Sequence, residues 1–171
     1  LYDLTEAGRL DIPVIGVASR GWDDQTLRRE ARTALEASGR SIDDAVFDRL
    51  ASNLTYVSGN YKDPATYAEI ARRTPTDACA VAYLAIPPAL FSDVVEGLAA
   101  VGLHHLGRLV LEKPFGRDMQ SATELSEIVH RHYPEDRVYR IDHFLGKEAV
   151  QNLMIFRFSK DRKSTRLNSS H

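Results

Sequence analysis

Short apolar runs alternate along this chain with longer stretches in which apolar residues recur at helical spacing. The apolar runs predict strands at residues 13–18, 54–58, 78–86, 108–112 and 137–141. The intervening stretches predict helices at residues 23–38, 42–52, 65–73, 89–101, 118–132 and 147–154, and residues 1–8 fit the last turns of another helix. This alternation indicates an α/β fold in which helices cover both faces of a parallel sheet.

Several residues mark where the predicted elements begin and end. Aspartates suited to helix N-caps stand at the expected starts: Asp23, Asp24, Asp63 and Asp118. Gly8 and Gly39 follow predicted helices, where a residue without a side chain closes the last turn. Cys79 falls within the apolar run at 78–86, and we expect it to be part of the core.

Composition narrows the class of protein. The chain has 171 residues, 22 of them Lys or Arg and 24 Asp or Glu, which gives a formal net charge of −2. That length suits one domain, and the near-neutral charge argues against a surface built for nucleic acid or for anionic membranes. A single cysteine excludes a disulfide framework and fits a cytoplasmic protein. No apolar run reaches the roughly 18 residues of a membrane span.

Ligands of parallel α/β sheets bind beyond the carboxyl ends of the strands, and three polar segments stand there. The first is Ser19 with Arg20, directly after the run at 13–18. An arginine at this point can pair with the 2′-phosphate of NADP, where an acidic residue would favour NAD. An exposed loop arginine is the alternative that the residues leave open.

The second polar segment runs from Glu112 to Gly116. Pro114 restricts Lys113 to an extended conformation, and the bond between the two is a candidate cis peptide. Lys113 is then a cation fixed above the sheet edge, able to bind a hydroxyl or a phosphate. A turn with a solvated lysine fits the same residues equally well.

The third polar segment, residues 140–148, offers the most chemistry. His143 and Lys147 are four residues apart, so a helical turn would place both on one face. Gly146 lets backbone N–H groups approach an anion, and Asp142 can orient a histidine. These groups suit a phosphate dianion. The alternative is a helix start capped by Asp142 among surface charges. No histidine group has metal-ligand spacing, and we expect no metal site.

Residues 140–148, together with 112–116, closely resemble the glucose-6-phosphate dehydrogenase family. Residues 83–88 and 150–154 support the resemblance, which covers about residues 1–160 in the family's order. It implies oxidation of glucose 6-phosphate to 6-phosphoglucono-1,5-lactone, with hydride transfer from C1 to NADP, in the oxidative pentose phosphate pathway.

The resemblance also implies roles for individual residues. Lys113 would contact both substrate and cofactor, and Asp142 would orient the histidine that takes the C1 hydroxyl proton. The residues that would bind the substrate are Lys113, His143, Phe144, Leu145, Gly146 and Lys147.

Cofactor contacts are implied at Ser19, Arg20, Phe91 and Lys113. Ser19 stands where the family commonly has the arginine or lysine that reads the 2′-phosphate, so Arg20 would serve from one position later. Phe91 stands where the family often has a tyrosine near the cofactor. The family's glycine-rich phosphate loop and its general-base histidine have no match in this sequence.

We therefore expect a piece of a longer enzyme. Residues 1–148 would form a Rossmann-like, doubly wound parallel sheet truncated at its N-terminal strand and phosphate loop. Residues 149–160 would begin the C-terminal α+β domain, and 161–171 would be a non-native, disordered tail. The piece alone should show no dehydrogenase turnover, whereas the full-length protein should be a homodimer or homotetramer. The alternative is a non-catalytic α/β module that binds a phosphorylated sugar or nucleotide.

Overall fold

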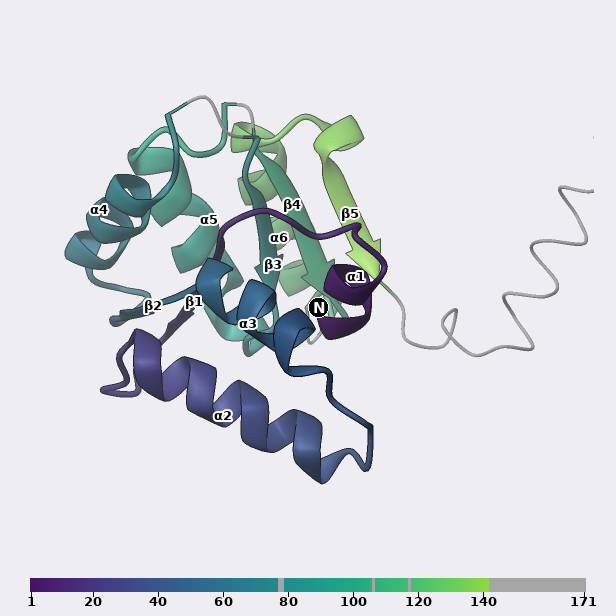
Figure 1. The fold of residues 1–171 in the computed structure, drawn as a ribbon. Coiled ribbons are helices and arrows are strands. Elements are labelled where there is room, and N and C mark those ends of the chain that lie inside the picture. Colours follow the sequence, from purple (N-terminus) through teal and green to yellow (C-terminus); the bar gives the residue numbers. More distant parts are fainter. Residues whose placement is uncertain (77–78, 106, 117, 142–171) are drawn as a thin grey trace, which may run out of the picture. The chain divides into compact units, whose positions relative to one another are not determined.

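The computed structural model describes residues 1–76, 79–105, 107–116 and 118–141 (Figure 1). The chain divides into two compact units. The first consists of Leu1–Ala80 with Ser92–Leu106, and the second contains Val81–Phe91 and the described residues from Gly107 onward. Each unit contains its own parallel sheet, so the predicted α/β class is confirmed.

The first unit is built around a two-stranded parallel sheet. Its elements in chain order are α1 (Tyr2–Glu6), β1 (Val14–Ala18), α2 (Asp24–Ala37), α3 (Asp44–Asn53), β2 (Leu54–Ser58), α4 (Pro64–Arg73) and most of α5 (Phe91–Ala100). β1 and β2 pair in register from Val14 opposite Leu54 to Ala18 opposite Ser58. Both strands therefore end at the same edge, where the loop containing Ser19 begins.

Apolar residues of α1, α3 and β2 form the core of the first unit. The buried members of this cluster are Tyr2, Val46, Phe47, Leu50 and Leu54. The backbone N–H of Asp43 also donates to the Tyr2 hydroxyl over 2.8 Å, which ties α1 to the start of α3. The short first helix is thus held by packing against α3 rather than by its own length.

The second unit contains three parallel strands in the order β3-β4-β5. Its elements are β3 (Val81–Leu84), η1 (Pro88–Leu90), β4 (Arg108–Glu112), α6 (Met119–His132), η2 (Glu135–Arg137) and β5 (Val138–Ile141). Leu111 of β4 lines a small crevice with Leu125 and Val129 of α6, and all three side chains are buried. Burial in this unit also raises the pKa of Tyr133 to about 12.

Most predicted element boundaries agree with the structure to within about two residues. The side chains of Asp23, Asp63 and Asp118 accept hydrogen bonds from the first turns of α2, α4 and α6, as expected of N-caps. Gly8 and Gly39 have φ values of +66° and +73°, which suit glycine at a helix end. The predicted helix at 147–154 lies outside the described residues.

The predicted strand at 78–86 is the least accurate assignment. β3 spans only Val81–Leu84, and Cys79 is exposed, so its placement in the core was wrong. Val81 and Tyr83 are 57% and 51% exposed because they point to one face of the strand, whereas Leu84 points to the other and is buried. An uninterrupted apolar run therefore did not mean burial on both faces.

Two side chains of α2 close the outer edge of β2. The Asp24 carboxylate accepts a hydrogen bond from the backbone N–H of Tyr56 over 2.6 Å. The Arg28 guanidinium donates twice to the carbonyl oxygen of Leu54, over 3.1 and 2.9 Å. These side chains bind the backbone carbonyl and N–H groups with which another strand would pair, so α2 blocks strand addition at this edge.

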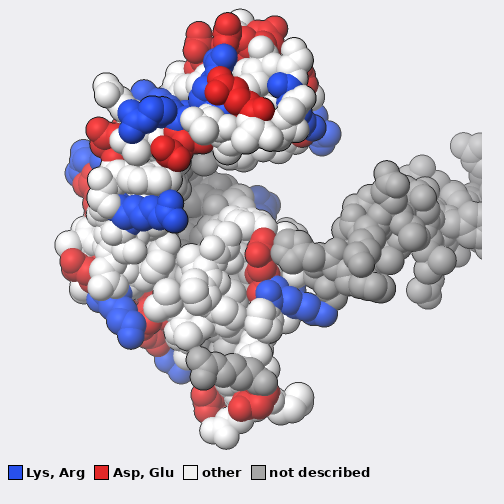
Figure 2. Space-filling view, turned by 90° about the horizontal axis from the view of Figure 1, so that it is seen from below, with Lys and Arg blue, Asp and Glu red and all other residues white. Residues whose placement is uncertain are grey.

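Charges of both signs are mixed on the described part of the face shown in Figure 2, where Lys and Arg lie among Asp and Glu. The ion pairs include Arg32 with Glu36 at 2.9 Å and with Asp44 at 2.7 Å. Among the described helices, none is long and apolar enough to cross a membrane.

Replacing Gly97 with alanine should destabilise the first unit. A Cβ at Gly97 would lie 2.2 Å from the ring atoms of Tyr67. That ring cannot yield easily, because it is buried and its hydroxyl donates to the carbonyls of Tyr61 and Asp93. We expect Gly97→Ala to lower the free energy of unfolding by about 1–3 kcal/mol in urea titrations followed by circular dichroism.

The control for this experiment is Gly21→Ala, where no atom beyond the adjacent residues lies within 4 Å of the added Cβ. That variant should stay within about 0.5 kcal/mol of the parent chain. In an unobstructed helix, Gly→Ala stabilises by about 1 kcal/mol. A Gly97→Ala chain more stable than its parent would therefore show that Tyr67 does not hold this position.

Candidate functional site

The loop after β1 carries two of the predicted cofactor residues at the carboxyl edge of the first sheet. Ser19 and Arg20 are exposed and follow Ala18 directly. The Arg20 carbonyl accepts a hydrogen bond from the Trp22 backbone N–H over 2.8 Å. The Tyr56 hydroxyl lies 3.2 Å from the carbonyl oxygens of both Ala18 and Arg20. The Tyr56 side chain of the neighbouring strand β2 thus holds the backbone of this short loop in place.

Aromatic contacts define where the Arg20 side chain lies. Its guanidinium carbon is 5.1 Å from the centroid of the Trp22 ring, within the range of a cation–π contact. The Trp22 ring lies in turn against Tyr56, with ring centroids 5.8 Å apart and planes tilted by 42°. In the part of the chain that the structure describes, Arg20 forms no ion pair. Its N–H donors are therefore available to a ligand.

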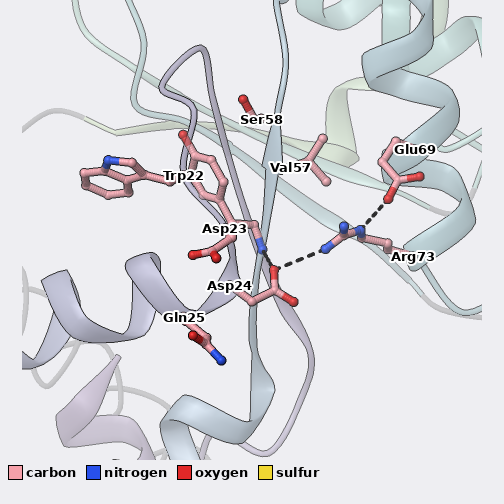
Figure 3. A pocket seen from close by; sticks show the side chains of 9 residues that line it. Trp22, Asp23, Asp24, Gln25, Val57, Ser58, Glu69 and Arg73 are labelled. Atoms are coloured by element: carbon pink, nitrogen blue, oxygen red, sulfur yellow. Dashed lines mark hydrogen bonds and ion pairs between the residues drawn. The ribbon is translucent and has the colours of Figure 1, made fainter.

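A hollow of about 520 Å³ lies beside this loop (Figure 3). Its lining comes from the start of α2, the end of β2 and α4: Trp22, Asp23, Asp24, Gln25, Tyr56, Val57, Ser58, Glu69 and Arg73. Figure 3 shows Arg73 reaching between Asp24, at 3.3 Å, and Glu69, at 2.6 Å. The hollow is therefore lined by polar groups that are already joined in a network.

Two of the three carboxylates that line the hollow, Asp24 and Glu69, form ion pairs with arginines. Hydrogen bonds from Arg72 and Arg73 lower the pKa of Glu69 to about 2, so this carboxylate is ionised at neutral pH. The Asp23 carboxylate accepts from the backbone N–H of Thr26 at the start of α2, and its pKa is lowered mainly by that residue. These carboxylates are bound by other groups of the fold, and the described residues contain no cluster of His, Cys, Asp or Glu side chains that could hold a metal ion.

Lys113 stands at the corresponding edge of the second sheet. It is exposed, directly follows β4, and is joined to Pro114 by a cis peptide bond, as the sequence suggested. Gly116 has a φ of +157°, and a Cβ there would lie 2.6 Å from the backbone nitrogen of Ala122 in α6. The absence of a side chain at Gly116 thus allows the loop to pass close to the first turn of α6.

Of the remaining predicted site residues, Phe91 is the one that lies in the described part of the chain. Phe91 begins α5 and is only 1% exposed, so in the structure its ring is a packing residue. Its assignment to the cofactor site stays a prediction. Asp142, His143, Phe144, Leu145, Gly146 and Lys147 lie outside the described residues, and their assignments also stay predictions.

Arg140 is the second-to-last residue that the structure describes before that segment. Its guanidinium donates to both carboxylate oxygens of Glu135, over 2.6 and 3.3 Å. His130 of α6 pairs with the same carboxylate. Arg140 and His130 together lower the pKa of Glu135 to about 2. Arg140, part of the anion-binding segment predicted at residues 140–148, is thus bound by Glu135 of η2, the short helix that precedes its strand.

Sequence reasoning missed Trp22 and Tyr56. Trp22 is the only tryptophan of the chain and stands two residues after Arg20, which could have drawn attention to it. Tyr56 gave no signal of its own, because an aromatic residue inside a short strand is ordinary. Its double role depends on contacts with residues more than 30 positions away.

Comparisons with known proteins identify what the chain resembles. The family model for the NAD binding domain of glucose-6-phosphate dehydrogenase matches residues 1–152. Glucose-6-phosphate 1-dehydrogenase 1 of Mycobacterium tuberculosis is 43% identical over 161 residues, which cover 93% of this chain and 34% of that protein. The chain therefore spans about a third of the length of this relative.

Solved structures give the same result. A glucose-6-phosphate 1-dehydrogenase from Mycobacterium avium matches with a TM-score of 0.84 and 42% identity, covering 92% of this chain and 35% of that one. A glucose-6-phosphate dehydrogenase in complex with its substrate glucose-6-phosphate matches with a TM-score of 0.78 and 34% identity, at the same two coverages.

The ion pairs of Glu135 and Glu69 should make stability fall at low pH. Their pKa values are about 2 in the folded chain, against an ordinary value of 4.5. The stabilisation is complete above pH 4.5 and is lost as the pH falls toward 2. We expect the urea midpoint of the parent chain to drop over this range more steeply than that of Glu135→Gln.

Glu127→Gln is the matched control, because it removes an exposed carboxylate of α6 that the described structure leaves without an ion pair. Its pH profile should follow that of the parent chain. If Glu135→Gln also gave an unchanged profile, the pairing of Glu135 with Arg140 and His130 would not exist in solution.

Proposed function

The chain belongs to the glucose-6-phosphate dehydrogenase family, and on this premise we propose that its protein oxidises glucose 6-phosphate to 6-phosphoglucono-1,5-lactone. The family expected from residues 112–116 and 140–148 is thereby confirmed, as is the Rossmann-like α/β fold. The observation that carries the proposal is the family match over residues 1–152, a range that contains every proposed site residue.

We propose NADP as the cofactor. The matched family model is an NAD binding domain, which supports a nicotinamide cofactor, and Arg20 supports the phosphorylated form. Its guanidinium lies at the carboxyl end of β1 without a carboxylate partner among the described residues, where it fits a ribose 2′-phosphate. Ser19 would add a hydroxyl donor beside it. When bound, NADP supplies the hydride acceptor for C1 of the sugar.

Lys113 would hold the reacting end of the substrate next to the cofactor. It extends from the carboxyl end of β4, which is where ligands approach a parallel sheet. Its ammonium group donates hydrogen bonds and accepts none, so it suits a sugar hydroxyl and the charge of a nearby phosphate. Phe91, buried at the start of α5, would support the cofactor site by packing.

Residues 142–147 would hold the substrate phosphate. His143 and Lys147 supply its donors, with Phe144, Leu145 and Gly146 in the same segment. Asp142 would orient the general-base histidine, a residue without a counterpart in this sequence. We assign residues 1–148 to the dinucleotide-binding domain and 149–160 to the start of the substrate domain, in a cytoplasmic homodimer or homotetramer.

Lys147→Ala in the full-length protein tests the substrate assignment. Loss of a charged hydrogen bond to the phosphate should raise the KM for glucose 6-phosphate by about 10–100-fold. The KM for NADP should change by less than about twofold, because this lysine would not contact the cofactor. Initial rates of NADPH formation, measured against each substrate in turn, give both constants.

Lys62→Ala removes an exposed lysine of the first unit, 3.9 Å from Asp93, and should leave both constants unchanged. Equal increases in the two KM values for Lys147→Ala would contradict the phosphate role. A full-length protein that binds glucose 6-phosphate yet never reduces NADP would instead favour a non-catalytic module.

A further inference from the structure

Arg20 differs from the nearby Arg28 and Arg73 in the kind of partner that holds its guanidinium. Arg28 donates to the Leu54 carbonyl, and Arg73 lies between Asp24 and Glu69. Both are therefore held by polar partners of the fold. Arg20 has the Trp22 ring as its partner instead, and its guanidinium edge is left without a carboxylate in the described part of the chain.

A guanidinium held by a ring keeps its hydrogen-bonding capacity. The Arg20 guanidinium carbon lies over the Trp22 ring, 5.1 Å from its centroid, and this cation–π contact occupies none of the N–H donors with an acceptor of the fold. The contact also restricts a long side chain that would otherwise sample many rotamers in water. Less entropy is then lost when a phosphate binds, which strengthens binding without a new contact.

The backbone beneath this pair is fixed as well. The Arg20 carbonyl accepts from the Trp22 N–H and lies within hydrogen-bond distance of the Tyr56 hydroxyl. The Trp22 ring packs against the Tyr56 ring. The nearby Asp24 carboxylate is paired with Arg73, so it does not compete for Arg20.

We propose that Trp22 is a positioning residue for cofactor selectivity, holding the Arg20 guanidinium ready for the phosphomonoester on the cofactor ribose. The preference for NADP over NAD then depends on Trp22 as well as on Arg20, although Trp22 itself need not touch the phosphate. This inference rests on the proposed dehydrogenase function. It adds to that function an explanation of how Arg20, one position after the residue that commonly reads the 2′-phosphate in the family, is held in place.

The test measures binding of NADP and of NAD separately in the full-length protein by isothermal titration calorimetry. Arg20→Gln should weaken NADP binding by about 10–100-fold and leave NAD binding within about twofold. Trp22→Leu should weaken NADP binding by about three- to fivefold, the loss expected when an exposed cation–π contact is removed, again without changing NAD binding.

Two further variants separate positioning from general support of the fold. Trp22→Phe keeps an aromatic face and should recover most of the NADP affinity. In the Arg20→Gln background, Trp22→Leu should have no further effect, because there is no guanidinium left to hold. The KM for NADP should follow the binding constants, while kcat and the KM for glucose 6-phosphate stay unchanged.

Other outcomes would overturn the inference. If Trp22→Leu weakened NADP and NAD equally, or still weakened NADP binding in the Arg20→Gln background, Trp22 would act on the fold and not through Arg20. Failure of the proposed function is seen separately, because the parent protein would then form no NADPH from glucose 6-phosphate.

Discussion

The hydrogen bond from the Tyr56 backbone N–H to the Asp24 carboxylate joins the first helix after β1 to the free edge of β2. Together with the Arg28 bonds to Leu54, it supplies partners for backbone groups that would otherwise be left to water or to another strand. Arg73 balances the charge of Asp24 from α4. Three elements of the first unit, α2, β2 and α4, are therefore positioned relative to one another by this one carboxylate.

The geometry of the candidate cofactor loop follows from that arrangement. Once α2 is fixed against β2, the chain has only the residues from Ser19 to Asp23 in which to leave β1 and begin the helix. Tyr56 contacts both ends of this turn. Its backbone N–H donates to the Asp24 carboxylate, and its hydroxyl lies within hydrogen-bond distance of the carbonyls of Ala18 and Arg20. Trp22 then packs on the Tyr56 ring and supports Arg20.

The sequence predicted those features whose causes are local. The bounds of β2 and the Asp63–Pro64 helix start follow from short-range patterns, and the structure has both. The family was predictable because its segments at 112–116 and 140–148 are distinctive. Cys79 was misplaced because an apolar run does not show where a strand begins. The bond between Asp24 and Tyr56 spans 32 positions, so no local pattern could reveal that an expected N-cap closes a sheet edge instead.

Amide hydrogen exchange of Tyr56, followed by NMR, tests most directly whether Asp24 holds this edge. In the parent chain the Tyr56 amide should exchange slowly, and in Asp24→Ala it should exchange at least about tenfold faster, corresponding to about 1.4 kcal/mol. The Val57 amide, which points toward β1 because neighbouring residues of a strand alternate, should change much less. Equal exchange of the Tyr56 amide in the two chains would show that the edge of β2 is held without Asp24, and that this carboxylate does not position α2, β2 and α4.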